Sequence, residues 1–155
     1  MAGGGSPLRI YVSNGDEYTI SVFRVDGTLE RLIRAPGRQL PISTDERSFA
    51  RQWLVWRNAK TDAGRANFAR IFDLLPQRTH HPPVSGLFVD RSGALWVREK
   101  HEQWSVFSAE GRWLAVLKIP LWRIFDVGED YILGVATDAD GVERVEEYRL
   151  ARAVY

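Results

Sequence analysis

The first third of the chain consists of short runs in which apolar and polar residues alternate. Three such runs cover residues 10–12, 18–22 and 29–34, and turn residues separate them at Asn14-Gly15 and Asp26-Gly27. Asn-Gly and Asp-Gly are the dipeptides most typical of tight β-hairpin turns. This part of the sequence therefore predicts a series of antiparallel strands.

Residues 43–76 follow a helical period instead. Two apolar stripes recur at helical spacing, made of Phe49, Trp53, Trp56 and then of Phe68, Ile71, Phe72, Leu75. Ser43 and Glu46 have the spacing of a capping box at the start of the first helix, and Pro76 ends the second. The pattern predicts a helical hairpin whose two apolar faces need a cover, most simply the neighbouring sheets.

Strand-like runs return at residue 84 and continue to residue 150. Turn residues such as Asp90-Arg91-Ser92-Gly93 and Asp140-Gly141 separate runs at 87–89, 95–97, 104–107, 113–119, 124–127, 131–135 and 142–150. Short strands with turns every 8–12 residues are typical of a β-meander, sandwich or propeller.

An internal repeat narrows these alternatives. Residues 20–36 align without gaps to residues 104–120, at an offset of 84, and share Ser, Val, Phe, Gly and Pro at equivalent positions. A third copy begins at Pro120, with residues 145–148 in place of 104–107. A repeated unit of about 37 residues has the length of a four-stranded propeller blade.

The repeat predicts a mainly β fold: a partial β-propeller of about two and a half four-stranded antiparallel blades with an inserted helical hairpin. Residues 1–7 are expected to form a flexible leader, and residues 8–155 a single domain. Within this domain the expected parts are an incomplete blade at 8–36, the hairpin at 43–76, a complete blade at 84–119 and an incomplete blade at 120–150. The first blade is expected to lack its first strand and the last blade its fourth.

Several segments resemble blade motifs of bacterial six-bladed propellers of the NHL-repeat and TolB-like groups. These segments are residues 83–97, 104–114, 127–134 and 145–150. The resemblance implies the C-terminal portion of a larger propeller protein, and it implies an exported, periplasmic or cell-envelope location. The chain departs from that group in having no signal peptide and about half of the blades, so the sequence itself leaves the location open and allows a truncated reading frame.

Incomplete blades have a consequence for assembly. Open strand edges and uncovered blade faces have to be covered by further blades or by self-association, since exposed edges pair readily with other chains.

Composition excludes several classes of protein. The chain has no cysteine, which excludes disulfide scaffolds, thiolate metal sites and thiol nucleophiles. Its net charge of +1 gives no reason to expect a nucleic acid as partner. No apolar run approaches the roughly 18 residues of a transmembrane helix.

The six tryptophans suggest two alternatives, a platform on which sugars stack or the packing between blades. The repeated positions favour packing, and the expected blade core is Phe23, Trp96, Trp104, Phe107, Trp113.

No catalytic, metal-binding or cofactor-binding residue is assigned, and no cofactor is expected. His80 and His81 are adjacent on a loop and His101 is distant in sequence, so no third ligand is evident. The acidic residues Asp90, Glu129, Asp130, Asp138 and Asp140 fit turn positions. No Gly-x-Ser-x-Gly motif is present.

Basic residues are frequent on the helical hairpin, and the weak candidates for an interaction face are Arg47, Arg51, Arg57, Arg65. A solvated outer face is the competing interpretation. The leading hypothesis is a non-enzymatic binding or scaffold module for an unidentified protein or small ligand. The alternative is a fragment of a metal-dependent propeller hydrolase or lyase, similar to propeller lactonases.

Overall fold

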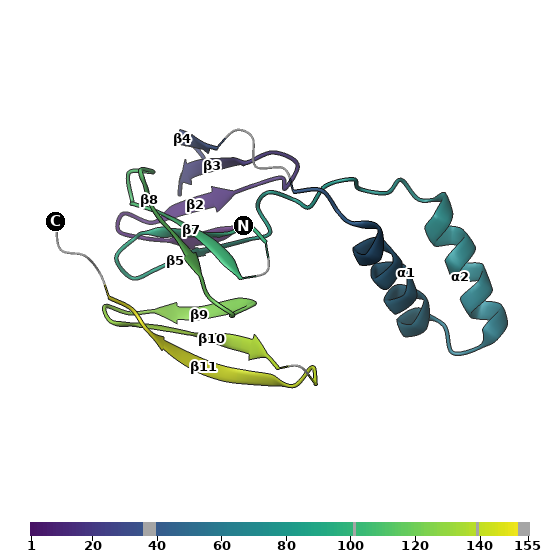
Figure 1. The fold of residues 1–155 in the computed structure, drawn as a ribbon. Helices are drawn as coiled ribbons and strands as arrows, with labels where there is room; N and C mark the ends of the chain where they lie inside the picture. The colour runs from purple at the N-terminus through teal and green to yellow at the C-terminus, as the bar shows by residue number, and fades with distance from the viewer. Residues whose placement is uncertain (36–39, 101, 139, 152–155) are drawn as a thin grey trace. The chain divides into compact units, whose positions relative to one another are not determined.

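The structure, a computed structural model, describes residues 1–35, 40–100, 102–138 and 140–151. The described residues contain eleven strands and two helices, so the fold is mainly β, as predicted (Figure 1). The chain divides into two compact units. Met1–Arg38 and Pro82–Tyr155 form the strand unit, and Gln39–His81 forms the helical unit.

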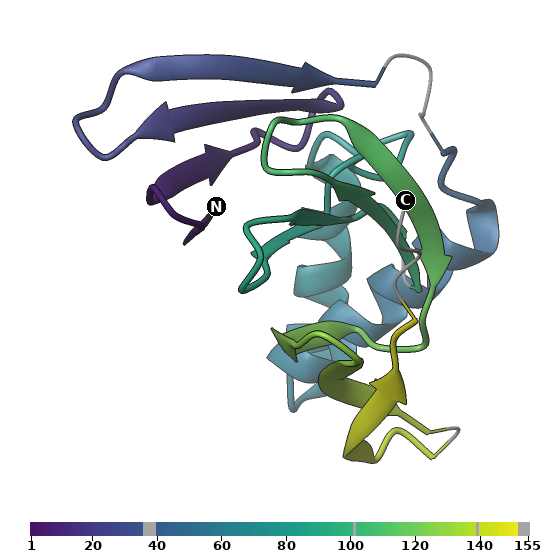
Figure 2. The same cartoon turned by 90° about the vertical axis from the view of Figure 1, so that its left-hand side faces the viewer.

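The strand unit contains three antiparallel sheets, which we call the first, middle and last sheet (Figures 1 and 2). The first sheet has the order β1-β2-β3-β4, formed by Ala2–Gly4, Arg9–Val12, Thr19–Arg24, Leu29–Arg34. The middle sheet has the order β5-β6-β7-β8, formed by Gly86–Val89, Leu95–Arg98, Gln103–Phe107, Trp113–Lys118. The last sheet has the order β9-β10-β11, formed by Arg123–Val127, Tyr131–Thr137, Glu143–Arg149.

The sequence repeat is also a structural repeat. β4 and β8 occupy equivalent positions at the offset of 84 residues. The register of each sheet shifts at the same place, between Val22 and Phe23 in β3 and between Val106 and Phe107 in β7. Gly27 and Gly111, with φ of 83° and 82°, close the two equivalent turns, where a left-handed backbone favours glycine. The first and middle sheets are therefore two copies of one four-stranded unit.

The first sheet corrects the expectation for the N-terminus. The leader expected at residues 1–7 contains β1, which pairs with β2, so the first sheet has four strands rather than three. The close approach of β1 to β5 explains Gly4, because a Cβ added there would lie 2.8 Å from the Val89 side chain. Three consecutive glycines give no alternating pattern from which a strand could be predicted.

Two clusters of buried side chains join the three sheets. One side of the middle sheet, with Leu95, Val97 and Phe107, packs against Ile20 and Val22 of the first sheet. Its other side carries Trp96, Trp104 and Val106 and packs against the last sheet, through residues that include Ile124, Val127, Ile132. The middle sheet is consequently covered on both sides, and each of its neighbours is covered by it on one side.

The expected blade core divides into buried and exposed members. Trp96, Trp104 and Phe107 are buried, and Phe23 is partly buried. Trp113 is 57% exposed, which corrects its expected place in the core. It begins β8, an edge strand of the middle sheet, so no further strand covers its outer side.

The helical unit consists of α1 (Thr44–Asn58) and α2 (Asp62–Leu74). A short two-stranded ribbon lies at its base, where Pro41 and His80 form a bridge. The Ile42 amide donates to the Thr79 carbonyl at 2.9 Å, and the His81 amide donates to the Leu40 carbonyl at 2.8 Å. The two chain segments that flank the helices are thus held side by side.

Candidate functional site

The helical hairpin begins with the capping box that the sequence predicts. The Ser43 hydroxyl accepts from the Glu46 amide at 3.1 Å, and the Glu46 carboxylate accepts from the Ser43 amide at 2.9 Å. At the start of α2 the Thr61 hydroxyl accepts from the Gly64 amide at 3.2 Å. Both helices therefore have one of their first free amides satisfied by a side chain.

An ion pair and a small apolar contact hold the two helices together. Arg51 of α1 donates two parallel hydrogen bonds to the Asp73 carboxylate of α2, at 2.8 and 2.7 Å. This contact lowers the pKa of Asp73 below its ordinary value, because the hydrogen bonds favour the charged carboxylate. Among the described residues of this unit, Val55 and Ala59 are buried. The side of α1 that faces α2 is thus only partly apolar.

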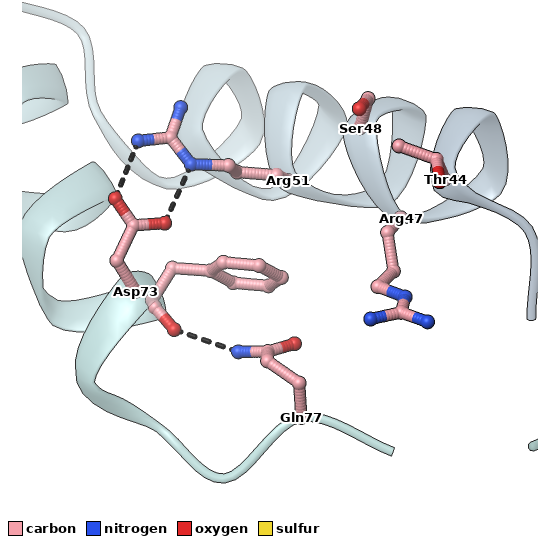
Figure 3. A pocket seen from close by; sticks show the side chains of 7 residues that line it. Thr44, Arg47, Ser48, Arg51, Asp73 and Gln77 are labelled. Carbon is pink, nitrogen blue, oxygen red and sulfur yellow. Dashed lines mark hydrogen bonds and ion pairs between the residues drawn. The ribbon is translucent and has the colours of Figure 1, made fainter. Parts of the chain in front are cut away.

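A pocket of about 260 Å³ lies between the two helices. It is lined by Thr44, Arg47, Ser48, Arg51, Phe72, Asp73, Gln77. Figure 3 shows the Arg47 side chain extending from α1 toward the segment that carries Gln77. Arg47 donates to the Ile42 carbonyl at 3.2 Å, and Gln77 donates to the Phe72 carbonyl at 2.7 Å. Two hydroxyls and a guanidinium at one small opening can receive a carboxylate or phosphate oxygen.

Large apolar side chains remain exposed on the hairpin. Phe49, Trp53 and Trp56 of α1 are 70%, 49% and 66% exposed. On and after α2 the exposed apolar side chains are Phe68, Ile71, Leu74, Leu75. Most apolar side chains of the two stripes are therefore exposed rather than buried between the helices, and Phe72, which lines the pocket, is half-buried.

Two arginines lie over the exposed tryptophan rings. The Arg57 guanidinium is 4.9 Å from the centre of the Trp53 ring, and that of Arg65 is 4.8 Å from the centre of the Trp56 ring. A cation held over an indole face is a favourable contact. We call Phe49, Trp53, Trp56, Arg57 and Arg65 the tryptophan–arginine surface.

The four arginines predicted as a weak interaction face therefore have different roles. Arg57 and Arg65 belong to the tryptophan–arginine surface, and Arg47 lines the pocket. Arg51 joins the two helices through Asp73. Thr44, Ser48 and Gln77 complete the pocket, and the sequence carries no motif that would have singled them out.

The tryptophans correct the general expectation of core packing. Trp53, Trp56, Trp113 and Trp122 are between 40% and 66% exposed, whereas Trp96 and Trp104 are buried. The helical spacing of Trp53 and Trp56 signals an apolar face, but it does not say whether the same chain covers that face.

The histidines and acidic residues do not gather into a metal site in the described part of the chain, where no group of three or more His, Cys, Asp or Glu side chains could hold an ion. His81 lies 3.2 Å from the Glu46 carboxylate, and His80 lies 2.9 Å from the Thr79 hydroxyl. His101 lies outside the described residues.

Two of the turn acids accept hydrogen bonds within their own turns. Asp90 accepts from the Ser92 and Ala94 amides and from the Trp96 indole N–H. Asp138 accepts from the Asp140 and Val142 amides. The interpretation of Asp90 and Asp138 as turn residues is confirmed, because their carboxylates close the loops between strands.

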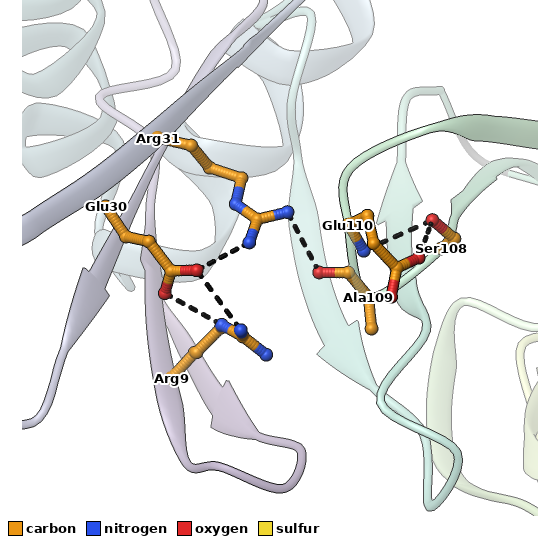
Figure 4. A network of polar contacts seen from close by, with 6 residues as sticks. All are labelled: Arg9, Glu30, Arg31, Ser108, Ala109 and Glu110. Atoms are coloured by element: carbon orange, nitrogen blue, oxygen red, sulfur yellow. Dashed lines mark hydrogen bonds and ion pairs between the residues drawn. The ribbon is translucent and has the colours of Figure 1, made fainter.

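A second group of charged side chains joins the first sheet to the middle sheet (Figure 4). Arg9 donates to both oxygens of Glu30 at 2.9 and 3.1 Å, and Arg31 donates to Glu30 at 2.5 Å and to the Ala109 carbonyl at 3.2 Å. Hydrogen bonds from Arg9 and Arg31 lower the pKa of Glu30 from 4.5 to about 2. The Glu30 carboxylate is satisfied within the protein, so this group is a structural contact rather than an open site.

This contact gives a prediction for acidic pH. A carboxylate whose pKa falls on folding stabilises the protein above its ordinary pKa, and this contribution disappears as pH falls through the folded-state value. The stability advantage of the wild type over Glu30→Gln is expected to be full at neutral pH and to shrink between pH 4.5 and about 2. Urea midpoints of the two proteins, measured across this range, test the prediction.

Glu17→Gln is the matched control, since Glu17 is exposed and has no ion pair among the described residues. Its difference from the wild type should stay small at every pH. A Glu30→Gln difference that is unchanged down to pH 2 would contradict the assigned role of Arg9 and Arg31.

Comparisons with models of protein families, with curated proteins and with solved structures found no match to this chain. Within the described residues, neither helix has the length and apolar character needed to cross a membrane.

Proposed function

We propose that the chain is a non-enzymatic binding module whose helical hairpin takes up an acidic, partly apolar segment of a partner protein. The observation that carries this proposal is the tryptophan–arginine surface. Trp56 is 66% exposed although Arg65 holds its ring in place, and Trp53 is 49% exposed under Arg57. Tryptophan and arginine are the residues that most often dominate binding energy at protein interfaces.

The charge of the hairpin indicates the chemistry of the partner. Residues 40–81 contain seven basic and four acidic residues. Arg47, Arg57 and Arg70 have no ion pair with any described carboxylate, whereas Asp73 is already neutralised by Arg51. Of these three arginines, Arg57 lies over an exposed tryptophan ring. An uncompensated cation beside an exposed ring favours a partner with carboxylates flanking apolar side chains.

We further propose that the three sheets are blades of a β-propeller that supports this hairpin. The support is the structural repeat of the first and middle sheets, together with the two-sided covering of the middle sheet. Successive four-stranded antiparallel sheets stacked face to face are the arrangement of propeller blades. A propeller also leaves its insertions free to contact other molecules.

Selection from a displayed library of random peptides tests the binding proposal. Peptides enriched on the full-length chain are expected to combine Asp or Glu with large apolar residues. Their dissociation constants should rise at least about tenfold in the double variant Trp53→Ala, Trp56→Ala, since each 1.4 kcal/mol of lost contact corresponds to a factor of ten. Binding should also weaken as salt is added.

Trp113→Ala is the matched control, because Trp113 is 57% exposed and lies in the strand unit. Its affinity for the selected peptides should stay within about twofold of the wild type, well below a single hot-spot loss. Peptides without acidic residues, or equal binding by the double variant and the control, would refute the proposal.

A further inference from the structure

The first and last sheets each have one side that no other sheet of the strand unit covers. We call the first outer face the side of the first sheet that points away from the middle sheet, with Ile10, Val12, Phe23, Leu29, Leu32. We call the last outer face the corresponding side of the last sheet, with Phe125, Leu133, Val145, Glu143, Glu147. Uncovered sheet faces of this kind mark interaction surfaces.

The first outer face is a continuous apolar row across three strands. Ile10 of β2 pairs with Phe23 of β3, and Phe23 pairs with Leu29 of β4. Leu29 and Leu32 are 49% and 42% exposed. Among the described residues, the one charged side chain at a regular position of this face is Arg34, the partner of Thr19 at the end of the row.

The last outer face is also apolar at its centre, and β11 carries charges of both signs on it, Glu143, Glu147 and Arg149. Val145 is 66% exposed and pairs with Val135, and Leu133 pairs with Glu147. Glu143 pairs with Thr137 on the same side. The Arg123 guanidinium lies 5.2 Å from the centre of the Phe125 ring, which is 45% exposed.

The repeat shows how these faces relate to the covered ones. Ile20 of the first sheet and Phe107 of the middle sheet share one buried cluster. At the next contact, Trp104 of the middle sheet and Tyr148 of the last sheet share the other cluster. Ile20 and Trp104 are equivalent positions of the repeat, as are Phe107 and Tyr148. The same pair of faces is therefore used twice within the chain.

A third use of this contact needs a surface that none of the three described sheets supplies. In the repeat, Val145 is equivalent to Ile20 and Trp104, and Phe23 is equivalent to Phe107 and Tyr148. Val145 lies on the last outer face and Phe23 on the first outer face. In the two contacts within the chain, a residue at the position of Val145 packs against the sheet that carries a residue at the position of Phe23.

We propose that a second copy of the chain supplies this half, with the last outer face of one copy packed on the first outer face of the other. Two copies related by a two-fold axis make the contact twice and cover both faces. The contact is independent of the tryptophan–arginine surface.

The experiment uses one charged substitution on each face of the full chain, Phe23→Lys and Val145→Glu. Sedimentation velocity over a concentration series should show a discrete oligomer for the wild type. In either single variant both copies of the contact are altered, and the dissociation constant should rise at least tenfold. Leu114→Lys, on the exposed edge strand β8, is the control and should associate like the wild type. Circular dichroism confirms that each variant is folded.

Mixing the two single variants distinguishes the proposed contact, between the last outer face of one copy and the first outer face of the other, from contacts between two identical faces. A mixed pair has one unaltered contact and one in which Lys at position 23 meets Glu at position 145, so the oligomer should return. A wild type that stays monomeric at every concentration would overturn the proposal. So would a Val145→Glu variant that associates normally, as expected if two first outer faces met, or a mixture no better associated than its components.

Discussion

Replacing Trp104 by alanine is expected to lower the free energy of unfolding by about 3–5 kcal/mol, which is the usual cost of removing a large buried aromatic side chain. Trp104 is 3% exposed and lies in the cluster that joins the middle and last sheets. Removing the indole leaves a cavity in this cluster. Among the described residues, the cluster is the only contact that the last sheet makes through buried side chains. Urea denaturation followed by far-UV circular dichroism measures it without relying on tryptophan fluorescence.

Trp113→Ala provides the comparison within the same sheet. Trp113 is on the strand next to that of Trp104 but is 57% exposed, so its removal should change stability by about 0.5 kcal/mol or less. The loss of unfolding free energy in Trp104→Phe should lie between those of Trp104→Ala and Trp113→Ala. The Trp104 indole N–H has no hydrogen-bond partner in the described structure, and phenylalanine removes this unsatisfied donor while retaining a ring. Equal losses at positions 104 and 113 would contradict the two-sided core.

Gly134→Ala is expected to destabilise the last sheet by about 3 kcal/mol, the upper part of the range for an overpacked core. Gly134 lies in the middle of β10 at the register shift with β9. A Cβ at this position would be 2.4 Å from the Arg123 carbonyl oxygen and 2.8 Å from Leu121 Cδ1. Because the first of these is a backbone atom, β9 and β10 would have to separate. Urea denaturation of the variant tests this.

Gly3→Ala is the control for the general effect of replacing a strand glycine. Its added Cβ would lie 3.7 Å from the Arg9 carbonyl oxygen, an ordinary contact. Stability should therefore be retained or rise slightly, since alanine restricts the unfolded chain more than glycine does. If Gly3→Ala and Gly134→Ala were equally destabilising, the close approach of β9 and β10 would not be the cause.

The strand repeat could be predicted because the same residue types recur at equivalent positions of the two copies. Phe23 and Phe107, with the turn glycines Gly27 and Gly111, occupy equivalent places in both sequence and structure. β1 could not be predicted, since Gly3 and Gly4 have no side chains whose alternation would show it. Its formation depends on β5, and on the absence of a Cβ at Gly4, which is a contact between segments far apart in sequence.

The candidate site was predictable only in part for a related reason. Helical spacing identifies Trp53 and Trp56 as members of one face, but exposure depends on what lies against that face. The hairpin closes instead through Arg51, Asp73 and Val55, on another side of α1. The spacing within one helix can be recognised from a short stretch of sequence. The pairing of Arg51 with Asp73 joins residues 22 positions apart, so no local pattern predicts it.

Because of the ribbon at the base of the hairpin, the distance between the two ends of this segment does not depend on how many residues lie between them. The hydrogen bonds between Leu40 and His81 and between Ile42 and Thr79 keep the entering and leaving segments adjacent, roughly 5 Å apart, whatever lies beyond them. The entropy of closing a flexible loop grows only with the logarithm of its length. During evolution the helices could therefore have been lengthened, exchanged or lost at small thermodynamic cost while the strands stayed the same.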